Sequence, residues 1–475
     1  MTSVVGKHVF FLGIGGIGMS ALARHLKFNG HVVGGYDLTP SDLLNQLVTE
    51  GIDVIHSDHP TSLPHWATGA NSDDLTVVWT PAVPQDLPLF QHFVSNGIHP
   101  IKRAALLGQI THNQPTLAVA GTHGKTTTSS WLAAMLSSSG QGCHAFLGGV
   151  NASLGSNYIT TAGATWHVVE ADEFDRSFHH LHPTHAAITN IEPDHMDIYE
   201  HAEAFRDAFE QFGQQVKDTL LLPASLSWPN SAANSLEMPH IERFAVCIEG
   251  EEVPEDVHHL AILSNSTQDV QFILGRHSNN NALSETTFVA QPALSGAHNV
   301  ANALVASALA WHTGIQGPEL AQTVQNFGGV KRRMEVHIDH PNGVYLDDYA
   351  HHPTELRVLL EAVRSRWPNR EITLVFQPHL YSRTRDFAAE FAEVLAQADR
   401  LFLLPIYPAR ETPIPGVDAQ WLFDNISSTH KHLTTSDSIF GDLKACPLDV
   451  LVTAGAGDID RLIPQAVQHM KARLE

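Results

Sequence analysis

Cysteine is scarce in this chain, with only Cys143, Cys247 and Cys446 among 475 residues. Their number and wide spacing exclude a disulfide framework and a CxxC motif, so free thiols in a reducing compartment are expected. Apolar runs of about 18 residues are also missing, which excludes a membrane-spanning helix. The N-terminal segment leads directly into a core strand and has no cleavage site, so we expect a cytoplasmic protein.

Basic side chains are few, since 27 Lys and Arg stand against 50 Asp and Glu, a net charge of −23. Such a surface repels a phosphate backbone, so we expect no nucleic-acid partner. An anionic ligand must then be held by local features, such as helix N-termini, a few cationic side chains or a metal ion. The 43% of hydrophobic residues is enough for several cores, and the length suggests about three domains at roughly 150 residues each.

A first glycine-rich turn lies at residues 10–20, "FFLGIGGIGMS", where an apolar strand runs into a helix. It holds Gly13, Gly15, Gly16 and Gly18, a spacing typical of dinucleotide-binding domains. Glycines permit a close approach to a diphosphate, and the helix N-terminus attracts it. Asp37 ends the next strand. An NAD-dependent dehydrogenase is one interpretation of this turn.

A second glycine-rich turn, "AVAGTHGKTTTS" at residues 118–129, favours a nucleoside triphosphate. Lys125 could reach the β- and γ-phosphates, and the Thr126 hydroxyl could ligate Mg²⁺. Val119 stands where the standard phosphate loop has its first glycine, so a plain strand–helix turn is the alternative. The loop candidates are Gly121, Thr122, His123, Gly124, Lys125, Thr126 and Thr127.

Acidic and polar side chains follow two later strands of this segment. Glu170, Asp172 and Glu173 end one strand, and Mg²⁺ prefers such oxygen ligands, although solvated loop acids are the alternative. The stretch 189–199, "TNIEPDHMDIY", carries Asn190, Asp194, His195 and Asp197 at the next strand end. A third group, His298, Asn299 and Asn302, opens a helix, where the spacing puts His298 and Asn302 on one face.

The order of strand and helix patterns predicts an α/β protein of three domains. We expect an N-terminal Rossmann-like domain at 1–113, a central P-loop-type ATPase domain at 114–329 and a C-terminal Rossmann-like domain at 330–475. Between about 223 and 296 the pattern loosens, which indicates a small, partly antiparallel extension. In the last domain, loops 347–355 and 376–386 follow strands and carry histidines and arginines, which suit a carboxylate-bearing substrate.

Taken together, these stretches resemble the Mur ligases, and within them the alanine-adding branch. "GIGGIGMS", "GTHGKTTT", "EADEFDRSF", "TNIEPDHMDIY", "GAHNVANA", "GVKRRME", "DDYAHHPTE", "FQPHLYSRTRD", "IYPARETPIPGV" and "TAGAGDI" occur in the family's order across nearly the whole chain. The resemblance implies ATP-dependent ligation of L-alanine to the lactyl carboxylate of UDP-N-acetylmuramate through an acyl phosphate, for peptidoglycan precursor synthesis. Its expected cofactors are ATP and Mg²⁺. The oligomeric state stays open.

The resemblance also implies roles for individual residues. The first glycine turn would hold the diphosphate of the UDP-sugar, with Asp37 at the uridine end. Lys125 and Thr126 would serve the ATP phosphates and Mg²⁺, and Glu173 and His298 would lie on the metal side. Asn299, Asn302 and Arg333 would contact the nucleotide, and His195 would lie beside the reacting carboxylate. The amino-acid side would be lined by Tyr349, His351, His379 and Arg383, and His351 or His379 would accept the amine proton.

Two departures from the family pattern matter. Several related ligases carry a carbamylated lysine after the "HMD" motif, and here no lysine occurs between His195 and Lys217, in agreement with the alanine-adding branch. Many members of that branch have a basic residue where this chain has Leu380. A murein-tripeptide ligase of cell-wall recycling is the nearest alternative function. A dehydrogenase or a non-catalytic sugar-nucleotide binder would lack a use for the phosphate and metal candidates.

Overall fold

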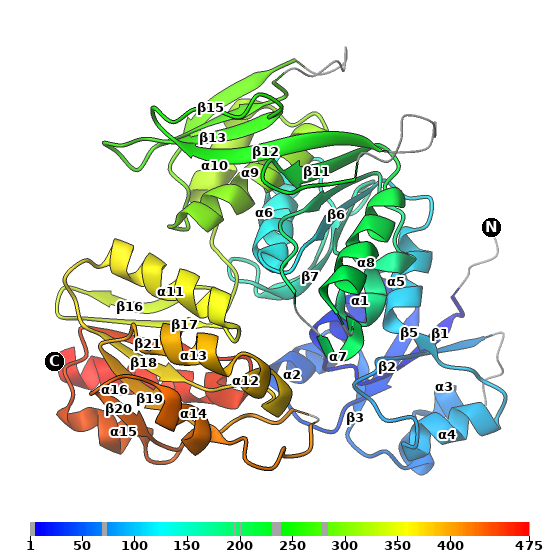
Figure 1. Cartoon of the computed structure of the whole chain (residues 1–475). Helices are drawn as coiled ribbons and strands as arrows, with labels where there is room; N and C mark the ends of the chain where they lie inside the picture. Colours follow the sequence, from blue (N-terminus) through cyan, green and yellow to red (C-terminus); the bar gives the residue numbers. More distant parts are fainter. Residues whose placement is uncertain are drawn as a thin grey trace. The chain divides into compact units, whose positions relative to one another are not determined.

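The computed structural model describes residues 5–68, 74–193, 196–199, 201–229, 239–276, 284–409 and 411–474. These residues form three β-sheets. The chain divides into two compact units, Met1–Gly329 and Val330–Glu475. The first unit holds the first two sheets and the second unit holds the third (Figure 1). The three-domain α/β organisation expected from the sequence is confirmed at the level of the sheets.

The first sheet is parallel, with the strand order β3-β2-β1-β4-β5. Its strands are β1 (His8–Leu12), β2 (Val32–Tyr36), β3 (Asp53–Ile55), β4 (Leu75–Trp79) and β5 (Ile101–Lys102). The connecting helices are α1 (Ile17–Phe28), α2 (Asp42–Thr49), η1 (Pro60–Ser62), α3 (His65–Thr68), α4 (Pro88–Ser95) and α5 (Arg103–Thr111). The order reverses beside β1, and ligands of open α/β sheets bind at such a switch point.

The central sheet has ten strands in the order β15-β14-β13-β12-β11-β10-β6-β9-β7-β8. The strands are β6 (Thr116–Ala120), β7 (His144–Asn151), β8 (Ser156–Thr160), β9 (His167–Glu170), β10 (His185–Ile188), β11 (Thr219–Pro223), β12 (His240–Ile248), β13 (His259–Leu263), β14 (Val270–Leu274) and β15 (Thr286–Ala290). Strands β6, β7 and β9 to β13 run parallel, whereas β8, β14 and β15 pair antiparallel to their neighbours. The antiparallel extension expected near 223–296 is therefore present.

Helices cover both faces of the central sheet. They are α6 (Lys125–Ser138), η2 (Phe174–His180), α7 (Met196–Tyr199), α8 (Ala202–Gln214), α9 (Ala297–Trp311) and α10 (Gly317–Asn326). Phe205, Phe209 and Phe212 of α8 pack into one core with alternate residues of β6, β9, β10 and β11. Helices α6 and α9 contact each other and the sheet, and the α9 sequence is apolar almost all round because α9 is buried.

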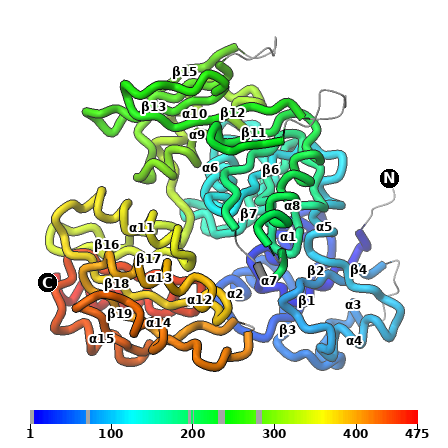
Figure 2. The backbone as a smooth tube through the Cα atoms, in the orientation of Figure 1, coloured from blue at the N-terminus to red at the C-terminus, as the bar shows by residue number. Residues whose placement is uncertain are grey.

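Helix α1 of the first sheet packs against β7 and β8 of the central sheet (Figure 2). Arg24 on α1 donates to the Asn157 side chain and pairs with Glu50 across 2.7 Å. His25 lies 2.8 Å from the Tyr158 hydroxyl, and burial lowers its pKa to about 3, so His25 is neutral in this contact. These buried polar contacts fix the two sheets against each other within the first unit.

The second unit is a six-stranded sheet in the order β16-β17-β21-β18-β19-β20, parallel except for β16. The strands are β16 (Glu335–His340), β17 (Gly343–Asp348), β18 (Ile372–Phe376), β19 (Arg400–Leu403), β20 (Lys431–Leu433) and β21 (Val450–Ala454). Its helices are α11 (Pro353–Arg366), α12 (Tyr381–Asp386), α13 (Ala388–Leu395), α14 (Ala419–Asn425), α15 (Ile439–Asp442), η3 (Leu443–Ala445), η4 (Asp458–Leu462) and α16 (Ile463–Leu474). Two apolar cores lie on its two faces.

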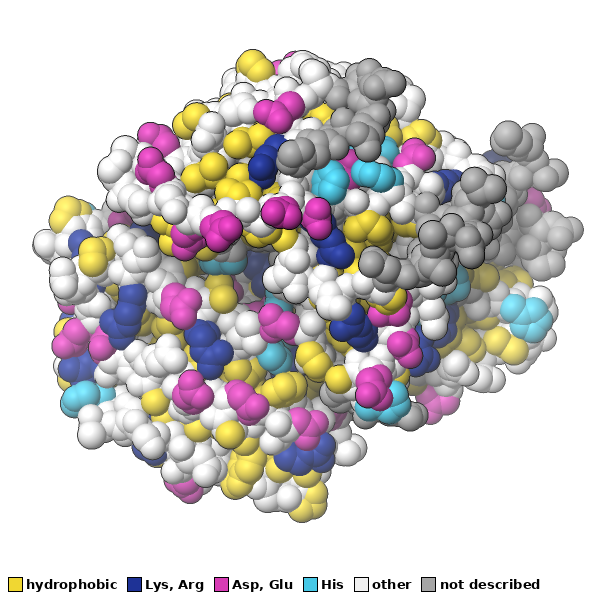
Figure 3. Space-filling view, turned by 45° about the horizontal axis from the view of Figure 1, so that its top comes forward, with side chains coloured by type: hydrophobic (Ala, Val, Ile, Leu, Met, Phe, Trp, Pro, Cys, Tyr) yellow, Lys and Arg dark blue, Asp and Glu magenta, His cyan; other side chains and the backbone are white. Residues whose placement is uncertain are grey.

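Figure 3 shows Asp and Glu side chains spread over the face in view and mixed with Lys and Arg, rather than a basic patch. In the described part of the chain, none of the helices has both the length and the apolar character needed to cross a membrane.

Candidate active site

The second glycine-rich turn joins β6 to α6, and its glycines are required by their surroundings. Gly121 and Gly124 have φ of +129° and +84°, which favour glycine. A Cβ at Gly121 would collide with Thr189 after β10, and one at Gly124 would lie 2.5 Å from Asn302 Oδ1 on α9. The turn therefore packs closely between the end of β10 and helix α9. The N-terminus of α6 follows the turn, and a helix N-terminus is a favourable place for an anion.

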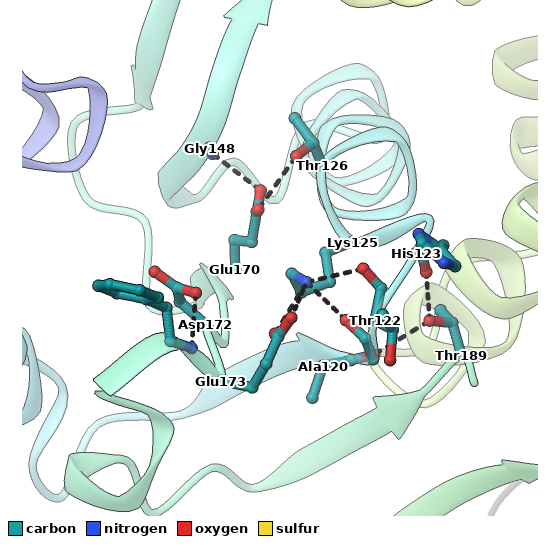
Figure 4. Close-up of polar contacts among 12 residues, drawn as sticks. Ala120, Thr122, His123, Lys125, Thr126, Gly148, Glu170, Asp172, Glu173 and Thr189 are labelled. Atoms are coloured by element: carbon teal, nitrogen blue, oxygen red, sulfur yellow. Dashed lines mark hydrogen bonds and ion pairs between the residues drawn. The ribbon is translucent and has the colours of Figure 1, made fainter. Parts of the chain in front are cut away.

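Lys125 is the first residue of α6, and its ammonium group points back into the turn (Figure 4). Its Nζ donates to the carbonyls of Gly121 and Thr122 at 2.6 and 3.1 Å and lies 2.8 Å from Glu173 Oε2. Burial lowers the pKa of Lys125, but Glu173 and the neighbouring carboxylates outweigh burial, so the net pKa is raised and the charge is kept. A buried cation is thus held where the sequence predicted phosphates.

Glu173 is the buried partner of this lysine, with only 2% of its side chain exposed. Burial raises its pKa to about 7, although the Lys125 charge opposes the shift. Strand β9 ends at Glu170, and the chain then turns through Asp172 into η2, which brings the Glu173 carboxylate back to the loop. Glu173 therefore contacts Lys125, and it does not contact the Thr126 hydroxyl.

Glu170 is the acid that meets Thr126. The Thr126 hydroxyl donates to Glu170 Oε1 at 3.0 Å, and the Gly148 N–H donates to Oε2 at 2.9 Å. A Cβ at Gly148 would collide with this carboxylate, so the glycine makes room for it. Burial raises the pKa of Glu170. A hydroxyl and a carboxylate oxygen beside a phosphate loop fit Mg²⁺, so Glu170, one of the three acids named from the sequence, is a metal candidate beside Glu173.

The rest of the loop is tied to the strand end after β10. The His123 N–H donates to Asn190 Oδ1 at 2.9 Å, and the Thr122 hydroxyl donates to the Glu192 carbonyl at 2.8 Å. Thr127 is buried on the first turn of α6. Asp194 and His195 lie outside the described residues, so the position predicted for His195 is not described.

Two of the three polar residues at the start of α9, Asn299 and Asn302, connect to the phosphate loop and the start of α6. The Thr128 hydroxyl donates to Asn302 Oδ1 at 3.2 Å, and Asn302 Nδ2 donates to Asn299 Oδ1 at 3.3 Å. Burial lowers the pKa of His298 to about 4, so its imidazole is neutral at pH 7 and able to bind a metal ion or accept a proton. The structure thus joins the loop to Asn299 and Asn302, which are far away in sequence.

The first glycine turn follows β1 at the switch point of the first sheet. Gly13 has φ of +86°, and its N–H donates to the Tyr36 carbonyl at 2.8 Å. Asp37 Oδ2 accepts from the Gly15 N–H at 2.9 Å, so this acid braces the turn itself. Gly16 caps α1, and a Cβ at Gly18 would lie 2.7 Å from Arg103 Nη1.

Arg103 links this turn to the acidic loop of the central sheet. The same guanidinium that lies against Gly18 pairs with Asp172 Oδ2 at 3.1 Å. Asp172 directly precedes Glu173. Sequence reasoning missed Arg103, because nothing in "IKRAALLG" indicates that a helix start in the first sheet reaches a loop about 70 residues away.

The predicted amino-acid side is grouped in the second unit. The His351 ring lies 5.3 Å from the Tyr349 ring and 5.8 Å from the His379 ring, and Arg383 Nη1 lies 3.5 Å from His379 Nδ1. The Arg333 guanidinium lies over the Tyr349 ring at 5.3 Å. The four residues predicted for the amino-acid side are thus neighbours on the loops after β17 and β18. Arg333, which was predicted to contact the nucleotide, joins them from the junction before β16.

Backbone strain and a neutral histidine mark the same group. Leu380 has φ of +71°, a conformation that L-residues rarely adopt and that clusters at functional sites. Burial lowers the pKa of His351 to about 4. His351 Nδ1 lies 2.9 Å from the Tyr349 carbonyl, which places the proton on Nδ1 and leaves Nε2 as an acceptor. The group therefore combines a neutral proton acceptor with cationic side chains.

Comparisons with known proteins cover the whole chain. The family described as "Mur ligase family, catalytic domain" matches residues 8–115, "Mur ligase middle domain" matches 119–310, and "Mur ligase, glutamate ligase domain" matches 332–458. A UDP-N-acetylmuramate–L-alanine ligase of Flavobacterium johnsoniae is 39% identical over 96% of both chains. One from Cytophaga hutchinsonii is 41% identical over 96% of this chain and 95% of the relative.

Solved structures give the same fold. A UDP-N-acetylmuramate-alanine ligase of Thermotoga maritima is similar with a TM-score of 0.76 at 24% identity, over 98% of this chain and 99% of that chain. A murein peptide ligase of Psychrobacter arcticus has a TM-score of 0.70 at 23% identity, over 98% of both chains. At these identities the two structures support the fold and do not distinguish the acceptor.

Proposed function

The chain belongs to the Mur ligase family, and from this premise we propose that it joins L-alanine to the lactyl carboxylate of UDP-N-acetylmuramate with ATP. The main support is that this chain is about 40% identical to alanine ligases over nearly its full length. The buried pair of Lys125 at the phosphate loop and Glu173 agrees with this function. We propose that residues 1–113 bind the UDP-sugar, 114–329 bind ATP and 330–475 bind the amino acid. The tripeptide ligase of recycling is the less favoured function, because the curated relatives given above are alanine ligases.

The first chemical step requires two anions to meet. A lactyl carboxylate oxygen attacks the γ-phosphorus of ATP, and the bond from this phosphorus to the β–γ bridging oxygen breaks. ADP is released, and the substrate carboxylate becomes an acyl phosphate. Lys125 supplies a fixed positive charge at the loop, and the α6 N-terminus adds backbone donors. Thr126 and Glu170 would hold Mg²⁺, with His298 as a further candidate ligand. The ion would neutralise phosphate charge when bound.

The second step needs a neutral amine. The alanine nitrogen attacks the acyl carbon, a tetrahedral intermediate forms, and phosphate leaves as the carbon–oxygen bond breaks. The amine proton goes to a histidine, for which His351 Nε2 is suited because His351 is neutral at pH 7. His379 is its neighbour and the second candidate. Arg383 and Arg333 provide positive charge for the alanine carboxylate and the nucleotide.

The acceptor is tested by phosphate release from ATP in the presence of UDP-N-acetylmuramate. L-alanine, glycine, L-serine and the murein tripeptide are compared at equal concentration. We expect the highest kcat/KM with L-alanine and only background release with the tripeptide. Release that depends on the tripeptide alone would move the protein to the recycling function, and UDP-sugar binding without any release would contradict the ligase function.

Arg103→Ala is expected to lower kcat/KM for UDP-N-acetylmuramate about 10- to 100-fold, since a charged hydrogen bond contributes about 1.5–3 kcal/mol. The Arg103 guanidinium contacts both Gly18 in the turn proposed to bind the UDP-sugar and Asp172 in the acidic loop. Its loss should make the position of the substrate's lactyl carboxylate relative to ATP less well defined. The measurement is the steady-state rate of phosphate release against UDP-sugar concentration at saturating ATP and L-alanine.

Lys102→Ala is the matched control for this variant. Lys102 precedes Arg103 and pairs with Asp175 at 2.7 Å, but both side chains are more than a third exposed, where an ion pair contributes little. Its kcat/KM should stay within about twofold of the wild-type value. Equal losses in the two variants would contradict a specific role for Arg103.

A further inference from the structure

A buried group of one carboxylate and two imidazoles lies on the central sheet, apart from the phosphate loop. Glu242 Oε2 lies 2.5 Å from His259 Nε2 and 2.9 Å from His312 Nε2. The exposed fraction of these three side chains is 0–4%. His240 adds a fourth group, since its Nδ1 lies 3.5 Å from Glu242 Oε1. We call these four residues the Glu242 cluster.

The strand register explains why these residues meet. His185 on β10 is level with Thr219 on β11, which is level with His240 on β12. Glu242 and Phe244 follow His240 at steps of two, so they share its face of the sheet, and Phe244 is level with His259 on β13. Helix α9 contacts β12 and β13 and ends just before His312. The His312 ring stacks on the His185 ring with centroids 4.8 Å apart.

The cluster lies at the opposite end of the parallel strands from the phosphate loop. His185 begins β10, whereas Thr189, which contacts the loop, follows the end of that strand. Helix α9 spans the two places, because its first turn carries Asn299 and Asn302 and its C-cap is His312. The Mg²⁺ candidates Thr126 and Glu170 therefore belong to a different site.

A bound cation would balance the negative charge of the buried Glu242 carboxylate. Glu242 is buried, and its carboxylate oxygens lie against three imidazole rings. Among the described residues, every ion-pair partner of Glu242 is a histidine. A buried carboxylate without a fixed positive partner is costly, and a divalent cation removes that cost.

We propose that the Glu242 cluster binds one Zn²⁺ ion through Glu242, His259 and His312. Zinc takes imidazole nitrogen and carboxylate oxygen in a tetrahedral arrangement with bonds of about 2.0–2.2 Å, so ligand atoms lie roughly 3.3 Å apart. Small side-chain rotations bring the present 2.5 and 2.9 Å separations to that spacing. Mg²⁺ and Ca²⁺ prefer all-oxygen sites and fit this cluster poorly.

The alternative to a metal ion is a proton shared between the Glu242 carboxylate and the histidine nitrogens. The Gly275 N–H donates to His259 Nδ1 at 3.4 Å, which puts the metal-free proton on Nε2, facing Glu242. Zinc at Nε2 requires the other tautomer, in which Nδ1–H faces the Gly275 N–H, so zinc binding breaks this long hydrogen bond and requires a small shift there. Zinc would tie β12 and β13 to the end of α9 and would thereby stabilise the helix that contacts the phosphate loop at its other end.

The test is the metal content of the full-length enzyme. Protein produced in zinc-supplemented medium is dialysed against metal-free buffer, and zinc is counted by mass spectrometry. We expect one zinc per chain, and Co²⁺ in its place should give the visible absorption of a tetrahedral nitrogen–oxygen site. Removal of zinc by a chelator, followed by assay in excess Mg²⁺, should lower the thermal midpoint while substantial phosphate release remains.

Variants assign the ion to the cluster. His259→Gln and Glu242→Gln should each lose the bound zinc and the Co²⁺ spectrum. His167→Gln is the control, because His167 is also buried but lies on β9. If His259→Gln does not fold, the stoichiometry and Co²⁺ spectrum of the wild type still decide. Wild-type protein without zinc and without Co²⁺ bands, or Glu242→Gln with unchanged zinc, would overturn the proposal in favour of a proton-linked cluster. Neither result depends on which acceptor the ligase uses.

Discussion

Lys125→Ala is expected to lower kcat for phosphate release by about 10³-fold, the loss seen when a preorganised charged donor is removed from a reacting centre. In the structure its ammonium contacts two loop carbonyls and Glu173, so it is held at the start of α6 before any ligand arrives. Because the charge is fixed in advance, its contribution falls on the transfer step, where the carboxylate and the γ-phosphate repel each other. The measurement is single-turnover phosphate release with saturating ATP, UDP-N-acetylmuramate and L-alanine.

The controls separate charge from folding. Lys471→Ala removes an exposed lysine from α16 and should leave the rate unchanged. Lys125→Arg keeps a positive charge but not the shape of the ammonium, and it should retain more activity than Lys125→Ala. A Lys125→Ala enzyme that is folded by circular dichroism and active within tenfold of wild type would contradict the phosphate role of the loop.

Lys125→Ala should also change how stability depends on pH. Burial already raises the pKa of Glu173 to about 7, and the Lys125 charge opposes this shift. Without Lys125, the pKa of Glu173 in the folded protein should be raised further. The folded variant then binds one proton more than the unfolded chain between about pH 4.5 and its raised folded pKa. Its free energy of unfolding should therefore fall as pH rises through this window. Thermal midpoints from pH 5 to 8.5 measure the effect, with Lys471→Ala as reference.

Glu170→Gln is expected to raise the Mg²⁺ concentration for half-maximal activity by about 10- to 100-fold, the loss typical for a partner of a metal site. Glu170 accepts from the Thr126 hydroxyl at 3.0 Å and from the Gly148 N–H at 2.9 Å, which fixes both carboxylate oxygens beside the loop. An amide in its place keeps the volume but removes the charge. Mn²⁺ binding in the presence of an ATP analogue, followed by electron paramagnetic resonance, gives a readout that does not depend on turnover.

Glu173→Gln is the matched variant for this comparison. Glu173 contacts Lys125 and not Thr126, so we expect a lower kcat with a Mg²⁺ requirement close to that of the wild type. The reverse outcome, with a raised Mg²⁺ requirement only in Glu173→Gln, would favour Glu173 as the residue on the metal side, as the family resemblance implies. Similar shifts in both variants would mean that the two carboxylates share the ion.

Local sequence determined much of this protein, because several of its signals act over only a few residues. Glycine at 121 and 124, followed by Lys125, predicts a phosphate turn on its own, since positive φ and a helix N-terminus need no distant partner. The loosening after residue 223 predicted the antiparallel strands β14 and β15. The helix expected to open at His298 is α9. Ordered motifs then indicated the family over the whole chain.

Only the tertiary structure decided which side chains meet. Glu170, Asp172 and Glu173 are nearly equivalent in the sequence. In the structure Glu170 contacts Thr126, Asp172 contacts Arg103 and Glu173 contacts Lys125. Arg103 could not be found, because its ion-pair partner Asp172 belongs to the loop of another sheet. The Glu242 cluster was also invisible, since parallel strand register and the end of α9 bring together residues about 70 positions apart. Such contacts depend on strand order and helix packing, which local propensity does not encode.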